Sequence, residues 1–133
     1  MSYPHSIFLI DDDVDDAEFF KEALQKLDHS IRFYSATNGD TANRQLAILH
    51  ESLPDFIFLD LNMPKINGKE FLREFRKNAA YENIRIVIYS TSINQRDMKE
   101  TIELGASDFL IKPTSLDDLV SGLKEVLNAN LEI

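Results

Sequence analysis

Five polar residues stand directly after short apolar runs of the sequence, at positions where buried strands would end. Three of them are carboxylates, one carries a hydroxyl and one carries an ammonium group. If the runs form a parallel sheet, the carboxyl ends of the strands share one edge, and these side chains converge on a single crevice. The five residues are Asp11, Asp12, Asp60, Ser90 and Lys112.

The carboxylates indicate a metal site. Three carboxylates at short range repel one another and raise the pKa of at least one of them unless a cation lies between them. Mg²⁺ prefers oxygen ligands, keeps several waters, and is commonly held by one or two carboxylates together with a phosphate oxygen. We therefore expect Asp11 and Asp12 to hold Mg²⁺ and Asp60 to share it.

Asp60 is also a candidate nucleophile. An aspartate can attack phosphorus to give an acyl phosphate, and this transfer asks the protein mainly for in-line positioning and charge neutralisation. Lys112 supplies a compact positive charge, and Ser90 supplies a hydroxyl for a phosphoryl oxygen. The set predicts that Asp60 accepts a phosphoryl group.

Each of these residues has an ordinary structural explanation when it is considered alone. Asp60 could be a turn residue because Asn62 follows it, Ser90 could cap a helix, and Lys112 could be a surface lysine. Their joint placement is what favours chemistry over these explanations.

The acidic stretch continues beyond Asp11 and Asp12. Acidic residues are typical of the first turn of a helix, where they cap free N–H groups and complement the helix dipole. We interpret Asp13, Asp15 and Asp16 in this way, as capping and surface charge.

The elements that must position these residues are short apolar runs separated by segments of helical period. The first, third and fourth runs are apolar at nearly every position, which is typical of central parallel strands covered on both faces. The five expected strands are 7–10, 31–34, 56–59, 84–89 and 109–111.

Apolar stripes mark helices between and after the strands. A weaker helix over 93–104 should stop at Gly105, and Ser115 with Asp118 should cap the last helix. The stripes consist of Ala17, Phe20, Leu24 and Leu27; Ala42, Leu46, Leu49 and Leu53; Phe71, Leu72 and Phe75; and Leu116, Leu119, Val120, Leu123 and Leu127.

This alternation predicts a doubly wound α/β fold with a five-stranded parallel sheet and five helices. Right-handed crossovers make 2-1-3-4-5 the expected strand order, as in flavodoxin-like folds, with a crevice between the first and third strands. We expect a single domain over 1–133, with its core at about 6–127 and no output domain.

Composition is consistent with a folded cytoplasmic domain. Hydrophobic residues make up 44%, charged residues 28%, and cysteine is absent. The start lacks a signal peptide, and no apolar run approaches the roughly 20 residues of a membrane span. The net charge of −9 opposes binding to phosphate backbones. We expect a cytoplasmic protein that contacts neither membranes nor nucleic acids directly.

The chain resembles the receiver domain of two-component response regulators over about residues 6–127. Five parts of the sequence agree with that family in order and spacing. They are Asp11-Asp12, Asp60-Leu61-Asn62-Met63-Pro64, Gly68, Ser90, and the segment from Gly105 to Pro113 that contains Lys112.

The resemblance assigns the metal site in more detail. It implies that Asp60 is the phosphorylated residue and that Asp12 ligates Mg²⁺ directly. Asp11 would be a second acidic partner, acting directly or through water. Asn62 would offer its backbone carbonyl to the metal.

The resemblance also implies a switch. Ser90 and Lys112 would bind the phosphoryl group, and the Lys112–Pro113 bond would be cis. Phe109 would turn inward when Ser90 moves toward the phosphate. This movement would remodel the face formed by the fourth helix, the fifth strand and the fifth helix, which a downstream protein of unknown identity would bind.

By the same resemblance the protein is not an enzyme, apart from catalysing its own phosphorylation and dephosphorylation. None of His5, His29 and His50 stands in a helical context suited to phosphoryl donation. The donor would therefore be the phosphohistidine of a sensor histidine kinase or phosphotransfer protein, or a small acyl phosphate.

Some positions depart from the commoner family pattern. Phe109 stands where tyrosine is frequent, and Thr114 stands where an aromatic residue often follows the proline. Ser92, two residues beyond Ser90, and Asn62 occupy positions that influence self-hydrolysis in the family. The lifetime of the phosphorylated state is therefore left open.

Two other functions remain open at this stage. A haloacid-dehalogenase-type phosphatase would use Asp11 as its nucleophile, followed in order by Asp13, Ser90, Lys112 and 117–118, but it leaves Asp60 unexplained. A degenerate receiver would bind partners without being phosphorylated.

Overall fold

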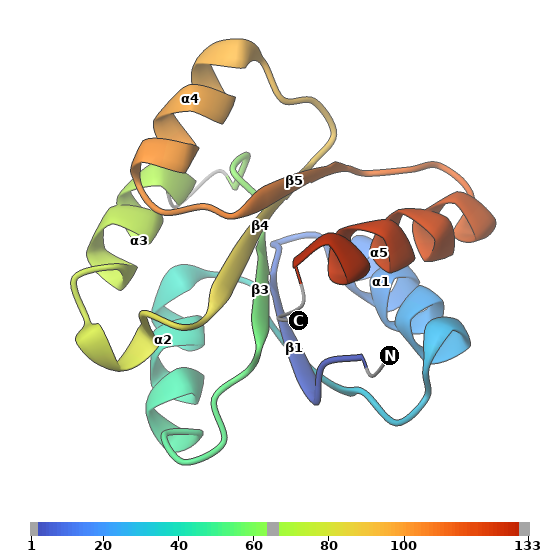
Figure 1. Ribbon diagram of the computed structural model, residues 1–133, viewed down its shortest axis with the longest axis horizontal. Helices are drawn as coiled ribbons and strands as arrows, with labels where there is room; N and C mark the ends of the chain where they lie inside the picture. The colour runs from blue at the N-terminus through green and yellow to red at the C-terminus, as the bar shows by residue number, and fades with distance from the viewer. Residues whose placement is uncertain (1–2, 64–66, 131–133) are drawn as a thin grey trace.

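The protein is a sheet of five parallel strands between two layers of helices (Figure 1). The computed structural model describes residues 3–63 and 67–130, so Pro64 of the predicted motif lies outside the described residues. The elements are β1 (Ser6–Ile10), α1 (Val14–Leu27), β2 (Arg32–Ala36), α2 (Gly39–Ile48), β3 (Phe56–Leu59), α3 (Gly68–Phe75), a 3₁₀ turn (Ala79–Tyr81), β4 (Arg85–Ser90), α4 (Gln95–Glu103), β5 (Asp108–Ile111) and α5 (Leu116–Asn130).

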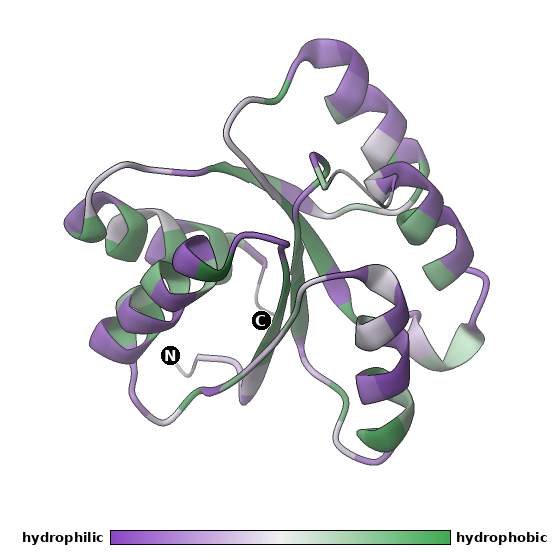
Figure 2. Ribbon diagram, turned by 180° about the vertical axis from the view of Figure 1, so that it is seen from behind, coloured by the Kyte–Doolittle hydropathy of each residue, from purple (hydrophilic) through white to green (hydrophobic). Residues whose placement is uncertain are grey.

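The strand order β2-β1-β3-β4-β5 confirms the predicted topology. The nearly continuous apolar strands β1, β3 and β4 are the central ones, as expected. α1 and α5 cover one face of the sheet, and α2, α3 and α4 cover the other (Figure 1). The central strands are largely hydrophobic, whereas the helices carry both hydrophilic and hydrophobic residues (Figure 2).

Alternation along each central strand fills two separate cores. In β3, Ile57 and Leu59 pack in the core beneath α2 and α3. Phe56 and Phe58 pack in the core beneath α1 and α5. A buried sheet of this kind fixes the register of its strands, since a slip by one residue would exchange the two cores.

Phe20 fixes α1 on the sheet. The side chain is fully buried, and its ring centroid lies 5.0 Å from that of Phe58 and 5.3 Å from that of Tyr89. Both contacts have the edge-to-face geometry that aromatic rings prefer. Because Phe20 lies in the second turn of α1, these contacts also place the first turn of the helix beside the ends of β1 and β3.

Side-chain caps set where several helices begin. The carboxamide of Asn94 accepts a hydrogen bond of 2.7 Å from Asp97 N, so α4 begins at Gln95 and is shorter at its start than the predicted 93–104. Gly105, with a φ of 107°, follows its last turn as predicted. Ser115 Oγ accepts from Asp118 N at 3.1 Å, which confirms the predicted cap of α5.

The second helix ends earlier than its apolar stripe indicates. α2 stops at Ile48, so the prediction that Leu49 and Leu53 belong to it is wrong. Pro54 disfavours helical backbone at Leu53, and the chain turns instead through a hydrogen bond of 2.6 Å from Ser52 N to Leu49 O. Leu53 still packs against the core from the connecting segment.

Lys69 on α3 joins that helix to α4. Its Nζ lies 2.6 Å from Asp97 Oδ1 and 2.6 Å from Glu100 Oε2. The contact with Lys69, together with that of Arg96, lowers the pKa of Glu100 to about 2.

None of the helices within the described ranges has the length and apolar character needed to cross a bilayer.

We predict that Phe20→Ala lowers the free energy of unfolding by about 3–5 kcal/mol, because it removes a fully buried ring and leaves a cavity. Chemical denaturation would measure the change. Ile48→Ala is the matched control, since that side chain is 78% exposed, and it should change stability by less than about 0.5 kcal/mol. A similar loss in both variants would contradict the assigned core.

We predict that Lys69→Met raises the pKa of Glu100 toward its ordinary value of 4.5. A lowered pKa in the folded state means that the ion pair stabilises the protein above pH 4.5 and that this contribution is lost as the pH falls toward about 2. A carboxylate NMR titration of wild type and variant would measure the pKa. Lys77→Met, which removes an exposed pair with Glu74, should leave Glu100 unchanged.

Candidate functional site

The register of the sheet brings the predicted residues to one edge. Ile10 pairs with Leu59 in neighbouring strands, so Asp11 and Asp60 follow side by side. Asp60 N donates a hydrogen bond of 3.0 Å to Ile10 O, at the end of that ladder. On the other side of β3, Lys112 N donates to Ser90 O at 2.8 Å. The polar residues therefore gather at the carboxyl ends of the central strands, where the sequence predicts the site.

The three predicted carboxylates form one cluster. One oxygen from each of Asp11, Asp12 and Asp60 lies within 4.8 Å of the others. Asp11 and Asp60 are only 2% and 5% exposed, whereas Asp12 is open to solvent. Two buried acids so close together require positive charge nearby.

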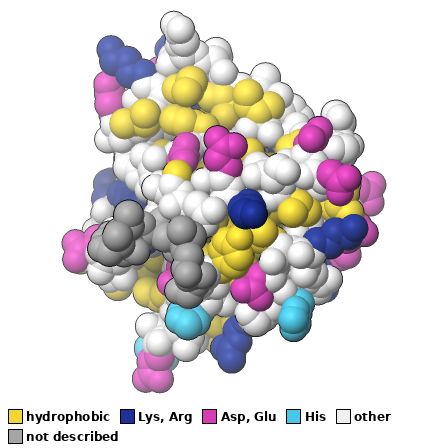
Figure 3. All heavy atoms as spheres, turned by 45° about the vertical axis from the view of Figure 1, so that its right-hand side comes forward, with side chains coloured by type: hydrophobic (Ala, Val, Ile, Leu, Met, Phe, Trp, Pro, Cys, Tyr) yellow, Lys and Arg dark blue, Asp and Glu magenta, His cyan; other side chains and the backbone are white. Residues whose placement is uncertain are grey.

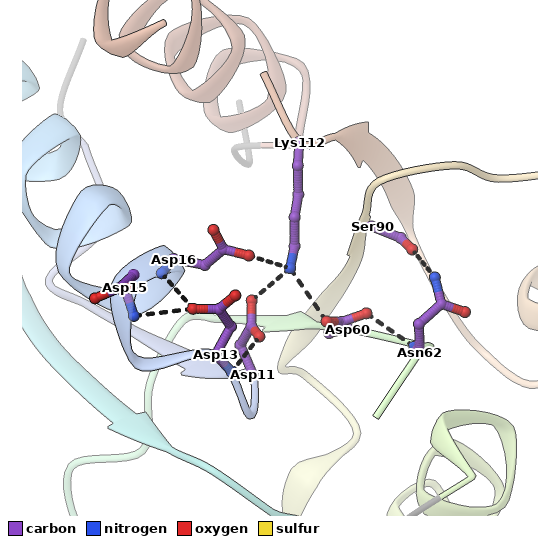
Figure 4. A network of polar contacts seen from close by, with 8 residues as sticks. All are labelled: Asp11, Asp13, Asp15, Asp16, Asp60, Asn62, Ser90 and Lys112. Atoms are coloured by element: carbon purple, nitrogen blue, oxygen red, sulfur yellow. Dashed lines mark hydrogen bonds and ion pairs between the residues drawn. The ribbon is translucent and has the colours of Figure 1, made fainter. Parts of the chain in front are cut away.

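Lys112 provides that charge. Its Nζ lies 2.8 Å from Asp11 Oδ2, 2.8 Å from Asp16 Oδ2 and 3.1 Å from Asp60 Oδ2 (Figure 4). Burial by itself lowers the pKa of Lys112, but the contacts with Asp11 and Asp16 and the charge of Asp60 together raise it above its ordinary value. The ammonium group therefore stays protonated at neutral pH. It also lies 5.3 Å from the centre of the Tyr89 ring.

The interpretation of Asp16 as surface charge is wrong. Asp13 caps α1 as predicted, accepting hydrogen bonds from Asp15 N and Asp16 N, and Asp15 is exposed. The side chain of Asp16, however, turns toward the crevice and accepts a hydrogen bond from Lys112 (Figure 4). The sequence did not predict this contact, because several acids follow one another in the first turn and composition alone does not distinguish which of them faces the sheet.

Ser90 and Asp60 are connected through Asn62. The backbone N–H of Asn62 donates to Asp60 Oδ1 at 2.8 Å, and its side-chain Nδ2 donates to Ser90 Oγ at 2.7 Å. Ser90 is fully buried, so its hydroxyl has this amide as a partner in place of water. Of the predicted residues, Asp11, Asp60, Asn62, Ser90 and Lys112 thus meet in one network, in which Ser90 is connected to Asp60 indirectly (Figure 4).

The cluster fits a divalent cation. Although Lys112 Nζ forms an ion pair with Asp11 Oδ2, no residue in the described part of the chain satisfies this buried oxygen with hydrogen-bond geometry. Burial raises the pKa of Asp11, against the contact with Lys112, which lowers it. An under-coordinated carboxylate beside two further acids, all oxygen donors, is the set that a hard cation such as Mg²⁺ or Mn²⁺ prefers.

The segment after β5 departs from one expectation. The described residues contain no cis peptide bond, so the predicted cis bond between Lys112 and Pro113 is wrong. An X–Pro bond intrinsically favours trans by about 0.5–1 kcal/mol, and Lys112 makes its contacts with the trans bond. Phe109 is half-buried and packs against the core beneath α2 and α3.

The molecular surface carries mixed charge on the side that Figure 3 displays. Lys and Arg side chains are dispersed there among Asp and Glu side chains, and the described residues of this side do not gather into one basic patch (Figure 3).

Asp117 and Asp118, which a phosphatase of the haloacid-dehalogenase type would need beside its nucleophile, lie in the first turn of α5.

Comparison with known proteins identifies relatives over nearly the whole chain. The family described as the response regulator receiver domain matches residues 7–124. Response regulator Rcp1 of Synechocystis is 32% identical over 120 residues, which cover 87% of this chain and 82% of Rcp1.

Solved structures share the fold as well. The phosphorylated cyanobacterial phytochrome response regulator RcpA matches with a TM-score of 0.82 and 29% identity, covering 98% of each chain. The Mn²⁺-bound form of Rcp1 matches with a TM-score of 0.75 and 28% identity, covering 92% of this chain and 91% of that one.

We predict that Asp12→Asn weakens Mn²⁺ binding by at least about tenfold, because even changes outside the ligand shell cost ~10- to 100-fold in metal affinity. The electron paramagnetic resonance signal of free Mn²⁺ would measure the affinity. Asp15→Asn removes the same charge from an exposed residue outside the cluster and should change the affinity by less than about twofold. Equal losses in the two variants would indicate a diffuse electrostatic effect instead of a site.

Proposed function

The chain belongs to the family of response regulator receiver domains, and we propose that it is a switch in which Asp60 accepts a phosphoryl group in a Mg²⁺-dependent reaction. One observation carries the proposal. The buried carboxylate of Asp60 lies 3.1 Å from Lys112 Nζ and within 4.8 Å of oxygens of Asp11 and Asp12. A buried nucleophile beside a cation and a set of metal-binding oxygens is the equipment that phosphoryl transfer needs.

In the proposed reaction an oxygen of Asp60 forms a bond to phosphorus. The bond between phosphorus and the donor breaks, and its electron pair stays with the leaving group. That group is an imidazole nitrogen, which takes up a proton, when the donor is a phosphohistidine. It is acetate when the donor is acetyl phosphate. Asp60 is thereby converted from a carboxylate to an acyl phosphate.

The surrounding residues would each support this step differently. Asp11 and Asp12 would hold Mg²⁺ with Asp60 and the carbonyl of Asn62, and the ion would neutralise charge on the transferred group. Lys112 would donate a hydrogen bond to a phosphoryl oxygen.

Ser90 would carry the chemical change outward. Its hydroxyl is bonded to Asn62 Nδ2 in the unphosphorylated protein, and it would exchange this partner for a phosphoryl oxygen. Phe109, which is half-buried at the neighbouring strand, would follow the movement inward. The exchange would bias the face of α4, β5 and α5 toward a second arrangement that a downstream protein binds.

The proposed phosphoryl donor is a sensor histidine kinase or a phosphotransfer protein, and we place both proteins in the cytoplasm. Family membership supports such a donor, and so does the chemistry of Asp60, which needs a donor with a labile P–N or acyl P–O bond.

We predict that incubation with acetyl phosphate and Mg²⁺ adds one phosphoryl group to the protein, and that Asp60→Asn abolishes the addition. Intact mass spectrometry would detect the adduct, and lability to hydroxylamine would identify an acyl phosphate. Asp40→Asn is the control, because Asp40 is an exposed acid in the first turn of α2. A normal, hydroxylamine-labile adduct in Asp60→Asn would sink the assignment.

The same variants separate the phosphatase alternative. Turnover of a general phosphatase substrate that is lost in Asp11→Asn and retained in Asp60→Asn would favour a nucleophile at Asp11. The proposed switch should show no such turnover in any of these proteins.

A further inference from the structure

Asp16 is the side chain at the site that the proposed reaction does not use. Its Oδ2 lies 2.8 Å from Lys112 Nζ, closer than the 3.1 Å that separates Asp60 Oδ2 from the same nitrogen. It belongs to α1 and reaches across the crevice to the lysine that follows β5 (Figure 4). The contact therefore connects segments that are 96 residues apart in the chain.

The backbone of α1 holds Asp16 in this position. Asp13 Oδ1 accepts hydrogen bonds from Asp15 N at 2.9 Å and from Asp16 N at 3.1 Å. Phe20, one turn further on, is fixed in the core beneath α1 and α5. Asp16 thus projects from a rigid turn, which is the condition for a side chain that has to orient another.

Lys112 contacts three acids. Its Nζ donates hydrogen bonds to Asp16 Oδ2 and Asp60 Oδ2 and forms an ion pair with Asp11 Oδ2, with all three oxygens within 3.1 Å of Nζ. Asp11 and Asp60 are also members of the metal-binding cluster, whereas Asp16 is not. A metal ion and a phosphoryl group would engage Asp11 and Asp60, whereas Asp16 would stay hydrogen-bonded to the lysine.

We propose that Asp16 is a positioning residue that anchors the Lys112 ammonium group at the crevice throughout the phosphorylation of Asp60. The inference rests on the proposed function for its reaction, but the anchor itself exists without a phosphoryl group. A lysine side chain held in advance loses less freedom when the phosphoryl oxygen arrives, so the anchor favours the transfer. The side chain of Asp16 is 37% exposed, compared with 0% for Asp11 and 7% for Asp60. It is therefore the acid of the three that meets the solvent.

Asp15 supplies a matched control. Both residues stand in the first turn of α1 and carry the same charge, so either substitution by alanine removes one negative charge from the same helix end. Asp15 is exposed and donates its N–H to the same cap, but only Asp16 is hydrogen-bonded to Lys112. A difference in behaviour between the two variants therefore reports the hydrogen bond between Asp16 and Lys112, because helix stability and net charge change equally in both.

The first measurement needs no phosphorylation. ¹⁵N-edited NMR of the wild-type protein should show the Lys112 ammonium protons near neutral pH, because burial and the hydrogen bonds to Asp16 and Asp60 slow their exchange with water. The signal should be lost in Asp16→Ala and retained in Asp15→Ala. A Lys112 signal that persists unchanged in Asp16→Ala would overturn the inference.

The second measurement is the rate of phosphorylation by acetyl phosphate, followed by intact mass. Asp16→Ala should be slower by about tenfold, the effect of losing one hydrogen bond to a charged group. Asp16→Asn, which keeps an acceptor oxygen, should recover part of the rate, and Asp15→Ala should stay within about twofold of wild type.

Two outcomes of the rate measurement carry different conclusions. Wild-type protein that accepts no phosphoryl group would contradict the proposed function. Equal rates for wild type and Asp16→Ala would contradict the anchoring role of Asp16 and leave the proposed function standing. The same conclusion would follow if Asp15→Ala were slowed as much as Asp16→Ala.

Discussion

Charge balance at one buried lysine is the constraint on which the site depends. Asp11 and Asp60 are nearly inaccessible to water, and two such carboxylates could not both stay ionised without a cation between them. Lys112, only 9% exposed, supplies this cation from the end of β5. Burial alone would lower the pKa of Lys112, but its contacts with carboxylates raise that pKa by more than burial lowers it. The acids and the lysine therefore require one another, and the sheet must bring them together.

The sheet does so because both of its faces are buried. Each central strand distributes alternate side chains to two cores, and a shift by one residue would exchange the two sets and misplace the polar residues at the strand ends. Asp11 and Asp60 thus lie side by side as a consequence of apolar packing several residues away. Apolar packing also positions α1, because the contacts of Phe20 with Phe58 and Tyr89 set where the first helical turn lies.

The sequence was sufficient to predict those features that follow from periodicity and from strand ends. Strand order and the convergence of Asp60 with Lys112 could both be predicted, since parallel strands end at one edge. Three details could not. The end of α2 depends on Pro54 and a local turn, the isomer at Pro113 depends on a small energy difference, and the orientation of Asp16 depends on how α1 docks. The periodicity of apolar residues reveals none of these three.

The network also bears on the proposed switch. Asn62 donates hydrogen bonds to Asp60 through its backbone and to Ser90 through its side chain, so the hydroxyl that would bind a phosphoryl oxygen already has a partner. A buried Ser90 without a partner would carry a desolvation penalty of about 1–3 kcal/mol. Because the amide removes this penalty, a phosphoryl group has to offer Ser90 a stronger hydrogen bond than Asn62 does. Hydrogen bonds to a charged oxygen are stronger than those between neutral groups, so the proposed exchange would be favoured when Asp60 carries the phosphoryl group.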